Sequence, residues 1–319
     1  MNTLADAKSA GNAGGIRKKS FRRRLWLQRE LVFMVLPFVA AALIFSYFPV
    51  WGWILAFKDY KPALGVMGSG WIGLENFRRL FSYDGFYYGL RNTLAISSLK
   101  YIFGFVSTIT LAVLLNEIRL ISFKRVVQTI SYLPHFVSWV VAANIVLTSL
   151  SPDGIINKAL IAIGILDAPV LFISKGNLFW LILALSEVWK EVGWGAIIYL
   201  AAMAGIDPQL YEAVSIDGGG RFSRIFHITL PGIAPVIKIL MILNAGMILN
   251  AGMEQVYLLS NPSVTAVSET LELFILKFGI KQGRFSFATA AGIFNTTVSM
   301  ILLFSANKLS EKVTGERAF

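Results

Sequence analysis

The chain has 319 residues, of which 56% are hydrophobic and 15% charged, and its mean hydropathy is +0.66. Soluble domains carry about 25% charged residues, so this composition excludes an ordinary soluble protein and indicates an integral membrane protein. The absence of cysteine excludes disulfides, thiolate metal sites and cysteine nucleophiles, and two histidines far apart in sequence do not favour a metal centre. The net charge of +11 does not indicate nucleic-acid binding, because the basic residues cluster beside apolar runs.

A basic cluster precedes the first long apolar run. It contains six lysines and arginines between Arg17 and Arg24. The apolar run that follows is too long for the core of a signal peptide and lacks a polar cleavage region. We therefore expect this run to be retained as the first transmembrane helix.

Six apolar runs are each long enough to cross a hydrocarbon core of about 30 Å. Such runs must satisfy their backbone polar groups internally, and they lack the alternation of barrel strands, so helices are expected. The predicted fold is an all-α membrane protein with six transmembrane helices. These helices are expected over residues 31–57, 92–116, 126–150, 178–205, 231–259 and 285–307.

The basic residues also predict an orientation. If the amino terminus is cytoplasmic, 16 lysines and arginines lie on the cytoplasmic side and 10 on the opposite side. The positive-inside rule therefore predicts that both termini are cytoplasmic. The expected organisation is a basic cytoplasmic tail over residues 1–30, a transmembrane domain over residues 31–307 and a cytoplasmic tail over residues 308–319.

A polar, patterned segment over residues 205–231 separates the fourth and fifth predicted spans. Asp207 can cap a short helix, and Pro208 suits the first position of that helix, where a missing amide proton costs nothing. The glycines from Gly218 to Gly220 should end it, since they tolerate positive φ angles. A second short helix is expected from about Arg221 to His227, before a proline that begins the fifth span.

The spacing in this segment resembles the cytoplasmic signature of the permeases of binding-protein-dependent ATP-binding-cassette importers. That signature is Glu-Ala-Ala, three residues, Gly, nine residues, Ile, one residue and Leu-Pro. The chain departs from it only at Val214, a modest apolar exchange for the third alanine, and Asp217 agrees with the sugar-importing members. The matching residues are Glu212, Ala213, Gly218, Ile228, Leu230 and Pro231.

The resemblance implies the type I ATP-binding-cassette importer permease fold, with a cytoplasmic coupling helix between helices 4 and 5. This helix would dock in a cleft of a nucleotide-binding subunit. The alternative is an amphipathic helix that rests on lipid, which the three acids and no base between Asp207 and Asp217 disfavour. The residues expected to couple to the ATPase are Asp207, Tyr211, Glu212, Ala213, Val214, Asp217, Gly218, Ile228, Leu230 and Pro231.

The resemblance also implies a multi-pass protein of the bacterial cytoplasmic (inner) membrane, surrounded by lipid, and a set of partners. These are a second homologous permease, two ATP-binding cassette subunits and an extracytoplasmic sugar-binding protein that docks on the outer loops 58–91 and 260–284. The chain has no Gly-x-x-x-x-Gly-Lys-Ser/Thr phosphate loop. ATP and magnesium are therefore expected on the partner ATPase subunits, and no cofactor, metal or nucleic acid on this chain.

Three segments narrow the resemblance to permeases for complex oligosaccharides and polysaccharide fragments, such as those from alginate or pectin. They are Ser69–Phe81, Glu187–Gly220 and Gly283–Asn295. The expected function is ATP-driven import of such an oligosaccharide substrate by alternating access, without enzymatic activity. An ion-coupled secondary sugar transporter is the alternative, because the fourth span contains carboxylates. A membrane enzyme would need a sizeable aqueous domain, and the sequence predicts none.

Charged residues inside the predicted spans are candidate site residues, because they are costly there and usually face the bundle interior. Glu187, Lys190 and Glu191 share one helical face, and an ion pair between Glu187 and Lys190 is expected. This face either lines the pathway, with a tryptophan stacking on a sugar ring, or forms a structural salt bridge. The asparagines of the fifth and sixth spans either bind sugar hydroxyls or serve helix packing. The candidate pathway residues are Glu187, Trp189, Lys190, Glu191, Trp194, Asn244, Asn250 and Asn295.

Overall fold

The computed structural model describes the backbone of residues 28–314 and the side chains of residues 28–312. Most of the predicted amino-terminal tail and the end of the carboxyl-terminal tail lie outside this range. The chain divides into two compact units, residues 1–54 and residues 55–319, and each is described by itself.

The first unit contains the beginning of the first predicted span. An α-helix, α2 (Arg29–Ala42), continues into the π-helical turn η1 (Leu43–Tyr47) and the 3-10 helix η2 (Phe48–Phe57). No residue of α2 is buried. A helical stretch over residues 29–57 is long and apolar enough to cross a membrane, as the sequence predicts.

The second unit is a bundle of long helices. Besides the first span, four stretches within residues 28–314 are long and apolar enough to cross a membrane, at residues 84–117, 139–162, 221–245 and 285–312. A further helix of sufficient length, α9, has 29 residues and differs from these in carrying three charges close together near its middle, Glu187, Lys190 and Glu191. The long helices are α5 (Asp84–Glu117), α9 (Gly176–Ala204), α12 (Leu230–Ala245) and α16 (Phe285–Thr314).

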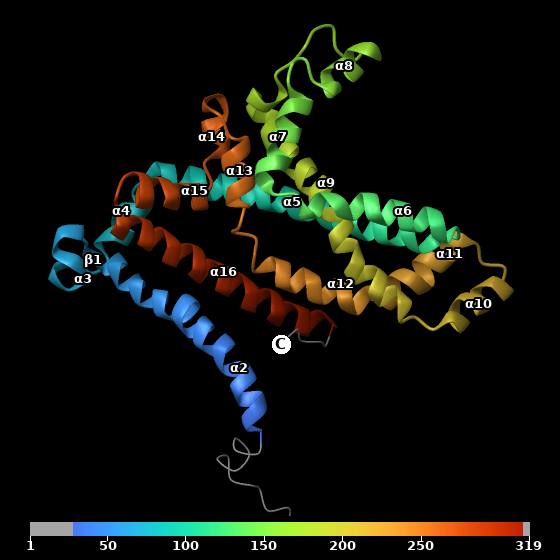
Figure 1. Cartoon of the computed structure of the whole chain (residues 1–319), viewed down its shortest axis with the longest axis horizontal. Coiled ribbons are helices and arrows are strands. Elements are labelled where there is room, and N and C mark those ends of the chain that lie inside the picture. Colours follow the sequence, from blue (N-terminus) through green and yellow to red (C-terminus); the bar gives the residue numbers. More distant parts are fainter. Residues whose placement is uncertain (1–27, 315–319) are drawn as a thin grey trace, which may run out of the picture. The chain divides into compact units, whose positions relative to one another are not determined.

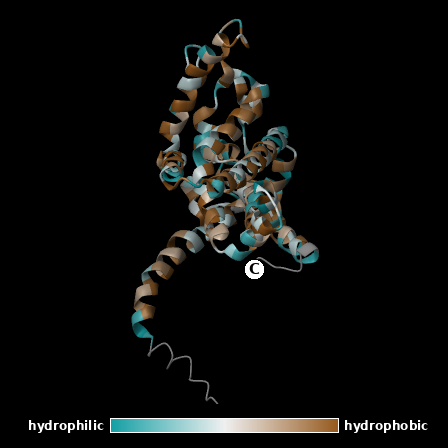
Figure 2. Ribbon diagram, turned by 90° about the vertical axis from the view of Figure 1, so that its right-hand side faces the viewer, coloured by the Kyte–Doolittle hydropathy of each residue, from teal (hydrophilic) through white to brown (hydrophobic). Residues whose placement is uncertain are grey.

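Helices α5 and α9 lie side by side and form the centre of the bundle (Figure 1). Small residues permit close helix contact, as at Gly193 of α9, which lies against the backbone of Ser131. Three clusters of buried side chains fill the unit, and their large members include Phe179, Phe86 and Ile233. Hydrophobic residues also extend along the helices in Figure 2. The bundle therefore keeps apolar surface for lipid or partner subunits.

The third predicted span, at residues 126–150, is wrong as a single helix. The structure divides it into α6 (Ile121–Tyr132), the short turn η4 (Leu133–Phe136) and α7 (Trp139–Leu150). Pro134 explains the interruption, because its ring removes a backbone donor and clashes with the preceding turn. The stretch long enough to cross a membrane instead runs through α7 into α8 (Ile155–Ala162).

The fifth predicted span, at residues 231–259, is also interrupted. Helix α12 ends at Ala245, residues 246–252 are not α-helical, and α13 (Met253–Leu259) follows. Gly252 has a φ of 77°, in the left-handed region that favours glycine. At the amino-terminal end of α12 the helical stretch extends without a break back to residue 221. The expected start of the span at Pro231 is therefore wrong as well.

Short elements connect the long helices. Two strands pair antiparallel, with Lys58 opposite Trp71. Two buried residues in the first third of α5 form hydrogen bonds with the segment between α13 and α16. Asn92 Nδ2 donates to the carbonyls of Ala266 (3.1 Å) and Glu269 (3.0 Å). Thr93 Oγ1 accepts a hydrogen bond from Leu271 N (2.8 Å). The remaining elements are β1 (Lys58–Asp59), η3 (Pro62–Leu64), α3 (Gly65–Gly68), β2 (Gly70–Trp71), α4 (Glu75–Phe81), η5 (Phe172–Ser174), α10 (Pro208–Ile216), α11 (Arg221–Arg224), η6 (Ile225–Thr229), η7 (Pro262–Val264), α14 (Thr265–Ser268), α15 (Leu271–Leu276) and η8 (Lys277–Lys281).

Candidate coupling segment and cavity

The polar segment between α9 and α12 folds as the sequence predicts at its first helix. Asp207 Oδ1 accepts a hydrogen bond from Gln209 N (2.9 Å), so it caps α10, and Pro208 holds the first position. At the other end Gly218 has a φ of 78°. The amide of Gly219 donates to the carbonyl of Val214 (2.8 Å), which is the hydrogen bond of a Schellman helix end.

The second helix of this segment differs from the prediction. Helix α11 begins at Arg221 but passes through the π-helical turn η6 into α12, instead of ending before Pro231. Pro231 is the second residue of α12 and follows the π-helical turn directly. The segment is thus joined rigidly to a membrane helix.

Two side-chain contacts fix the segment to the bundle. Tyr211 Oη lies 3.1 Å from Thr229 Oγ1, which connects α10 to η6. Arg221 Nε lies 3.3 Å from Glu117 Oε2, at the end of α5. The motif residues Glu212 and Ala213 are exposed, whereas Tyr211 is partly covered. Helix α10 therefore presents an acidic, small-residue face that no other described part of the chain covers.

A cavity of about 470 Å³ lies between α5, α9 and the interruption after α12. Four of the predicted pathway residues line it, together with several residues of α5. This volume falls in the range of small-molecule sites, which is about 300–1,000 Å³. The predicted residues at its wall are Glu187, Glu191, Asn244 and Asn250.

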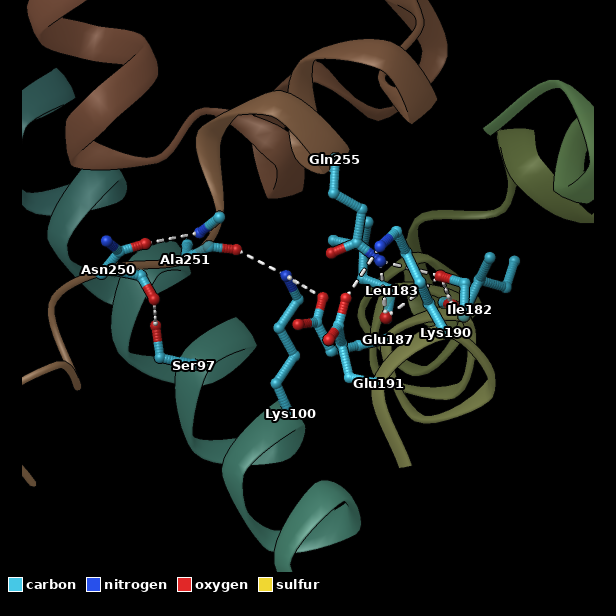
Figure 3. A network of polar contacts seen from close by, with 12 residues as sticks. Ser97, Lys100, Ile182, Leu183, Glu187, Lys190, Glu191, Asn250, Ala251 and Gln255 are labelled. Carbon is cyan, nitrogen blue, oxygen red and sulfur yellow. Dashed lines mark hydrogen bonds and ion pairs between the residues drawn. The ribbon is translucent and has the colours of Figure 1, made fainter. Parts of the chain in front are cut away.

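The expected ion pair between Glu187 and Lys190 is wrong. Glu187 Oε2 instead lies 3.3 Å from Lys100 Nζ on α5, and Lys190 Nζ lies 2.9 Å from Glu191 Oε1 (Figure 3). Lys190 also donates to the carbonyl of His135 (2.9 Å). The face of α9 therefore makes two separate ion pairs, one to α5 and one within α9, because a lysine of α5 reaches Glu187.

His135 joins the second of these groups. Its Nδ1 atom lies 2.7 Å from Glu191 Oε2, and its ring stacks on Trp194 with a centroid separation of 4.4 Å. The kink after Pro134 is thereby attached to α9. Trp194 is engaged with His135 instead of the cavity, and Trp189, Lys190 and Asn295 do not line the cavity either.

Lys100 is a site residue that the sequence analysis missed. It lines the cavity and its side chain is 10% exposed. The criterion that selected Glu187, a charge within a predicted span, applies equally to Lys100 and could have found it. Tyr101 and Tyr199 also line the cavity, and an aromatic residue within an apolar span gives no comparable signal.

A third carboxyl group lies near Lys100. Burial raises the pKa of Glu272 on α15, while the Lys100 ammonium and backbone amides of Ala251, Met253 and Gly252 lower it by less. The Oε2 atom of Glu272 is buried and makes no hydrogen bond within the described part of the chain. Lys100 is therefore attracted by carboxyl groups from two different elements.

These features define a helical, multi-span membrane protein with a cavity inside the bundle, whose wall includes charged and amide side chains, and a rigid polar segment at one end. Residues 100–314 match the family "Binding-protein-dependent transport system inner membrane component", and the chain belongs to that family. It is an inner-membrane permease subunit of a bacterial ATP-binding-cassette transporter that works with a separate binding protein. It is not an enzyme.

Two relatives from Bacillus subtilis (strain 168) cover nearly the whole chain. The chain is 42% identical over 313 residues to the polygalacturonan/rhamnogalacturonan transport system permease protein YteP, with 97% of each chain covered. It is 40% identical over 301 residues to Protein LplB, with 94% of each covered.

Solved structures are similar over the same extent. A chain in the crystal structure of a bacterial ABC transporter involved in the import of the acidic polysaccharide alginate is 37% identical, with a TM-score of 0.84. The match covers 92% of this chain and 99% of that chain. A second structure contains the alginate transporter in complex with an alginate pentasaccharide-bound periplasmic protein, with the same identity and TM-score.

Proposed function

We propose that this permease imports oligosaccharides or polysaccharide fragments. The similarity to a permease named for polygalacturonan and rhamnogalacturonan transport and to the alginate transporter supports this substrate class. The cavity supports it too, because its wall combines aromatic rings, Tyr101 and Tyr199, with the amides of Asn244 and Asn250. Rings can stack on a sugar face, and amides can both donate to and accept from hydroxyl groups. The comparisons give no support to the ion-coupled alternative.

In the proposed assembly the chain pairs with a second permease and two ATP-binding subunits, which bind ATP and magnesium. Both termini are cytoplasmic, so that α10 faces the ATP-binding subunits. The observation that carries this role is the capped helix α10, whose Glu212 and Ala213 are exposed and whose Gly218 turn joins it to α12. Because α11 continues into α12, displacement of α10 would reach the wall of the cavity.

The test measures ATP hydrolysis in proteoliposomes that contain this permease, its second permease and its ATPase, with and without sugar-loaded binding protein. We expect Glu212→Ala to reduce stimulation by about tenfold, since it removes the exposed carboxylate of the docking face. The matched control, Asp167→Ala, removes an exposed carboxylate from the segment between α8 and η5 and should leave stimulation unchanged. Normal assembly and normal stimulation of Glu212→Ala would contradict the coupling role.

A further inference from the structure

The interruption of the fifth span leaves backbone carbonyl groups without partners inside a helix. Residues 246–252 lie between α12 and α13 beside the cavity, and a non-helical segment inside a helix bundle needs partners for the carbonyls that no longer bond within a helix. Helix α5 supplies two donors. Ser97 Oγ donates to the carbonyl of Asn250 (3.1 Å), and Lys100 Nζ donates to the carbonyl of Ala251 (2.7 Å) (Figure 3).

Lys100 also connects this segment to α9. Its ammonium lies between the Ala251 carbonyl at 2.7 Å and Glu187 Oε2 at 3.3 Å. Gly252 provides the space, because a Cβ atom there would lie 2.9 Å from Lys100 Nζ. One buried cation therefore holds the end of an interrupted helix, the neighbouring helix and its own helix together.

A cation held by a backbone carbonyl and a carboxylate at a broken helix resembles the sites at which ion-coupled transporters bind a coupling ion. Here a side chain occupies that place. The positive charge is covalently attached, so it cannot enter and leave with each transport cycle. The site consequently holds charge without dependence on the ion concentration on either side of the membrane.

We propose that Lys100 is a tethered cation, a positioning residue that fixes the interrupted helix α12–α13 against α5 and α9 in place of an exchangeable ion. The role belongs to the substrate-free permease and does not depend on which solute is carried. Removal of the ammonium leaves the Ala251 carbonyl without its donor and Glu187 without its partner. A small diffusible cation of the right shape should then restore what the side chain supplied.

The experiment uses chemical rescue in the complete transporter. In Lys100→Ala the missing part of the side chain corresponds to n-propylammonium, so this ion is the probe and the neutral, similarly sized n-propanol is its control. We expect the variant to lose about tenfold or more of the stimulated ATP hydrolysis, because breaking a buried ion pair leaves an uncompensated charge. Propylammonium should restore most of that activity, and propanol should not.

Two further variants separate charge from volume. Lys100→Met fills the site without a charge and should be inactive with or without propylammonium. Lys100→Arg keeps the charge and should retain more activity than Lys100→Met. Wild-type activity of Lys100→Met would overturn the proposal, and so would equal rescue of Lys100→Ala by propanol.

Heat stability of the permease complex without substrate gives a readout that does not require transport. Propylammonium should raise the thermal midpoint of Lys100→Ala and leave that of the wild type unchanged. If Lys100→Ala fails to assemble, purification with propylammonium present should recover the complex, and failure to recover it would refute the inference. A residue that only contacts the sugar would change the response to loaded binding protein and leave the stability of the empty permease intact.

Discussion

Gly193 offers a direct test of the contact between α9 and α6. A Cβ atom added at this position would overlap the carbonyl group of Ser131 and lie 2.9 Å from the Ser131 Cβ atom. The obstacle is backbone, which cannot rotate away as a flexible side chain can. In Gly193→Ala the two helices must therefore separate by roughly 1 Å to regain an ordinary van der Waals distance.

The expected cost follows from two opposing effects. Overpacking of a tight contact costs about 1–3 kcal/mol in stability. The upper end of this range applies here because the added Cβ atom clashes with the backbone carbonyl of Ser131. Alanine in place of glycine inside a helix stabilises the folded protein by about 1 kcal/mol through its higher helix propensity. The net loss is about 2 kcal/mol, which corresponds to a fall of about 3 °C in the thermal midpoint of a chain of 319 residues.

The assay is the heat-induced loss of monodisperse permease complex in size-exclusion chromatography. Gly292→Ala is the matched control, since Gly292 also lies in a long helix but has no atom within 4 Å of an added Cβ. Its midpoint should stay the same or rise. A wild-type midpoint for Gly193→Ala would refute the account of how α9 and α6 pack.

Three other substitutions probe polar contacts by thermal midpoint, and the first of them also by proteolysis. Asn157 is fully buried and makes three hydrogen bonds to backbone groups, one of them from Val170 N. Asn157→Ala should therefore cost about 3 kcal/mol and expose residues 163–175, which follow α8, to protease. Unchanged resistance to protease would contradict this. Lys190→Met should cost about 3 kcal/mol, because Glu191 loses a buried partner. His135→Phe keeps the stack on Trp194 and should cost about 1 kcal/mol. A larger cost for His135→Phe than for Lys190→Met would contradict the assigned pairing.

The sequence predicts the class of fold well because apolar length is a local property. The second, fourth and sixth spans were expected at residues 92–116, 178–205 and 285–307, and each is a helix that extends to or beyond most of these limits. The third and fifth were placed wrongly, since hydropathy does not distinguish an apolar helix from an apolar turn. Pro134 and Gly252 were visible signals of the two interruptions.

The candidate site was predictable only in part. The cap at Asp207 and the turn at Gly218 depend on neighbouring residues, and both are confirmed by the structure. The partner of Glu187 depends on which helix lies beside α9, and a single sequence does not contain that information. Lys100 is 87 positions away from Glu187 in the chain, so no helical periodicity relates the two.

The hydrogen bonds of Asn92 and Thr93 have a consequence for biogenesis. Their partners are 174 to 178 positions later in the chain, in α14, in α15 and at Glu269 between the two. At a synthesis rate of about 5–20 residues per second, those partners follow after roughly 10–35 seconds. During that interval the Asn92 side-chain amide must be hydrated or contacted by the insertion machinery, whereas Thr93 Oγ1 already donates to the carbonyl of Gly89 in its own helix (2.8 Å). Residues in the final quarter of the polypeptide therefore complete the hydrogen bonds of α5, which is among the first helices to be synthesised.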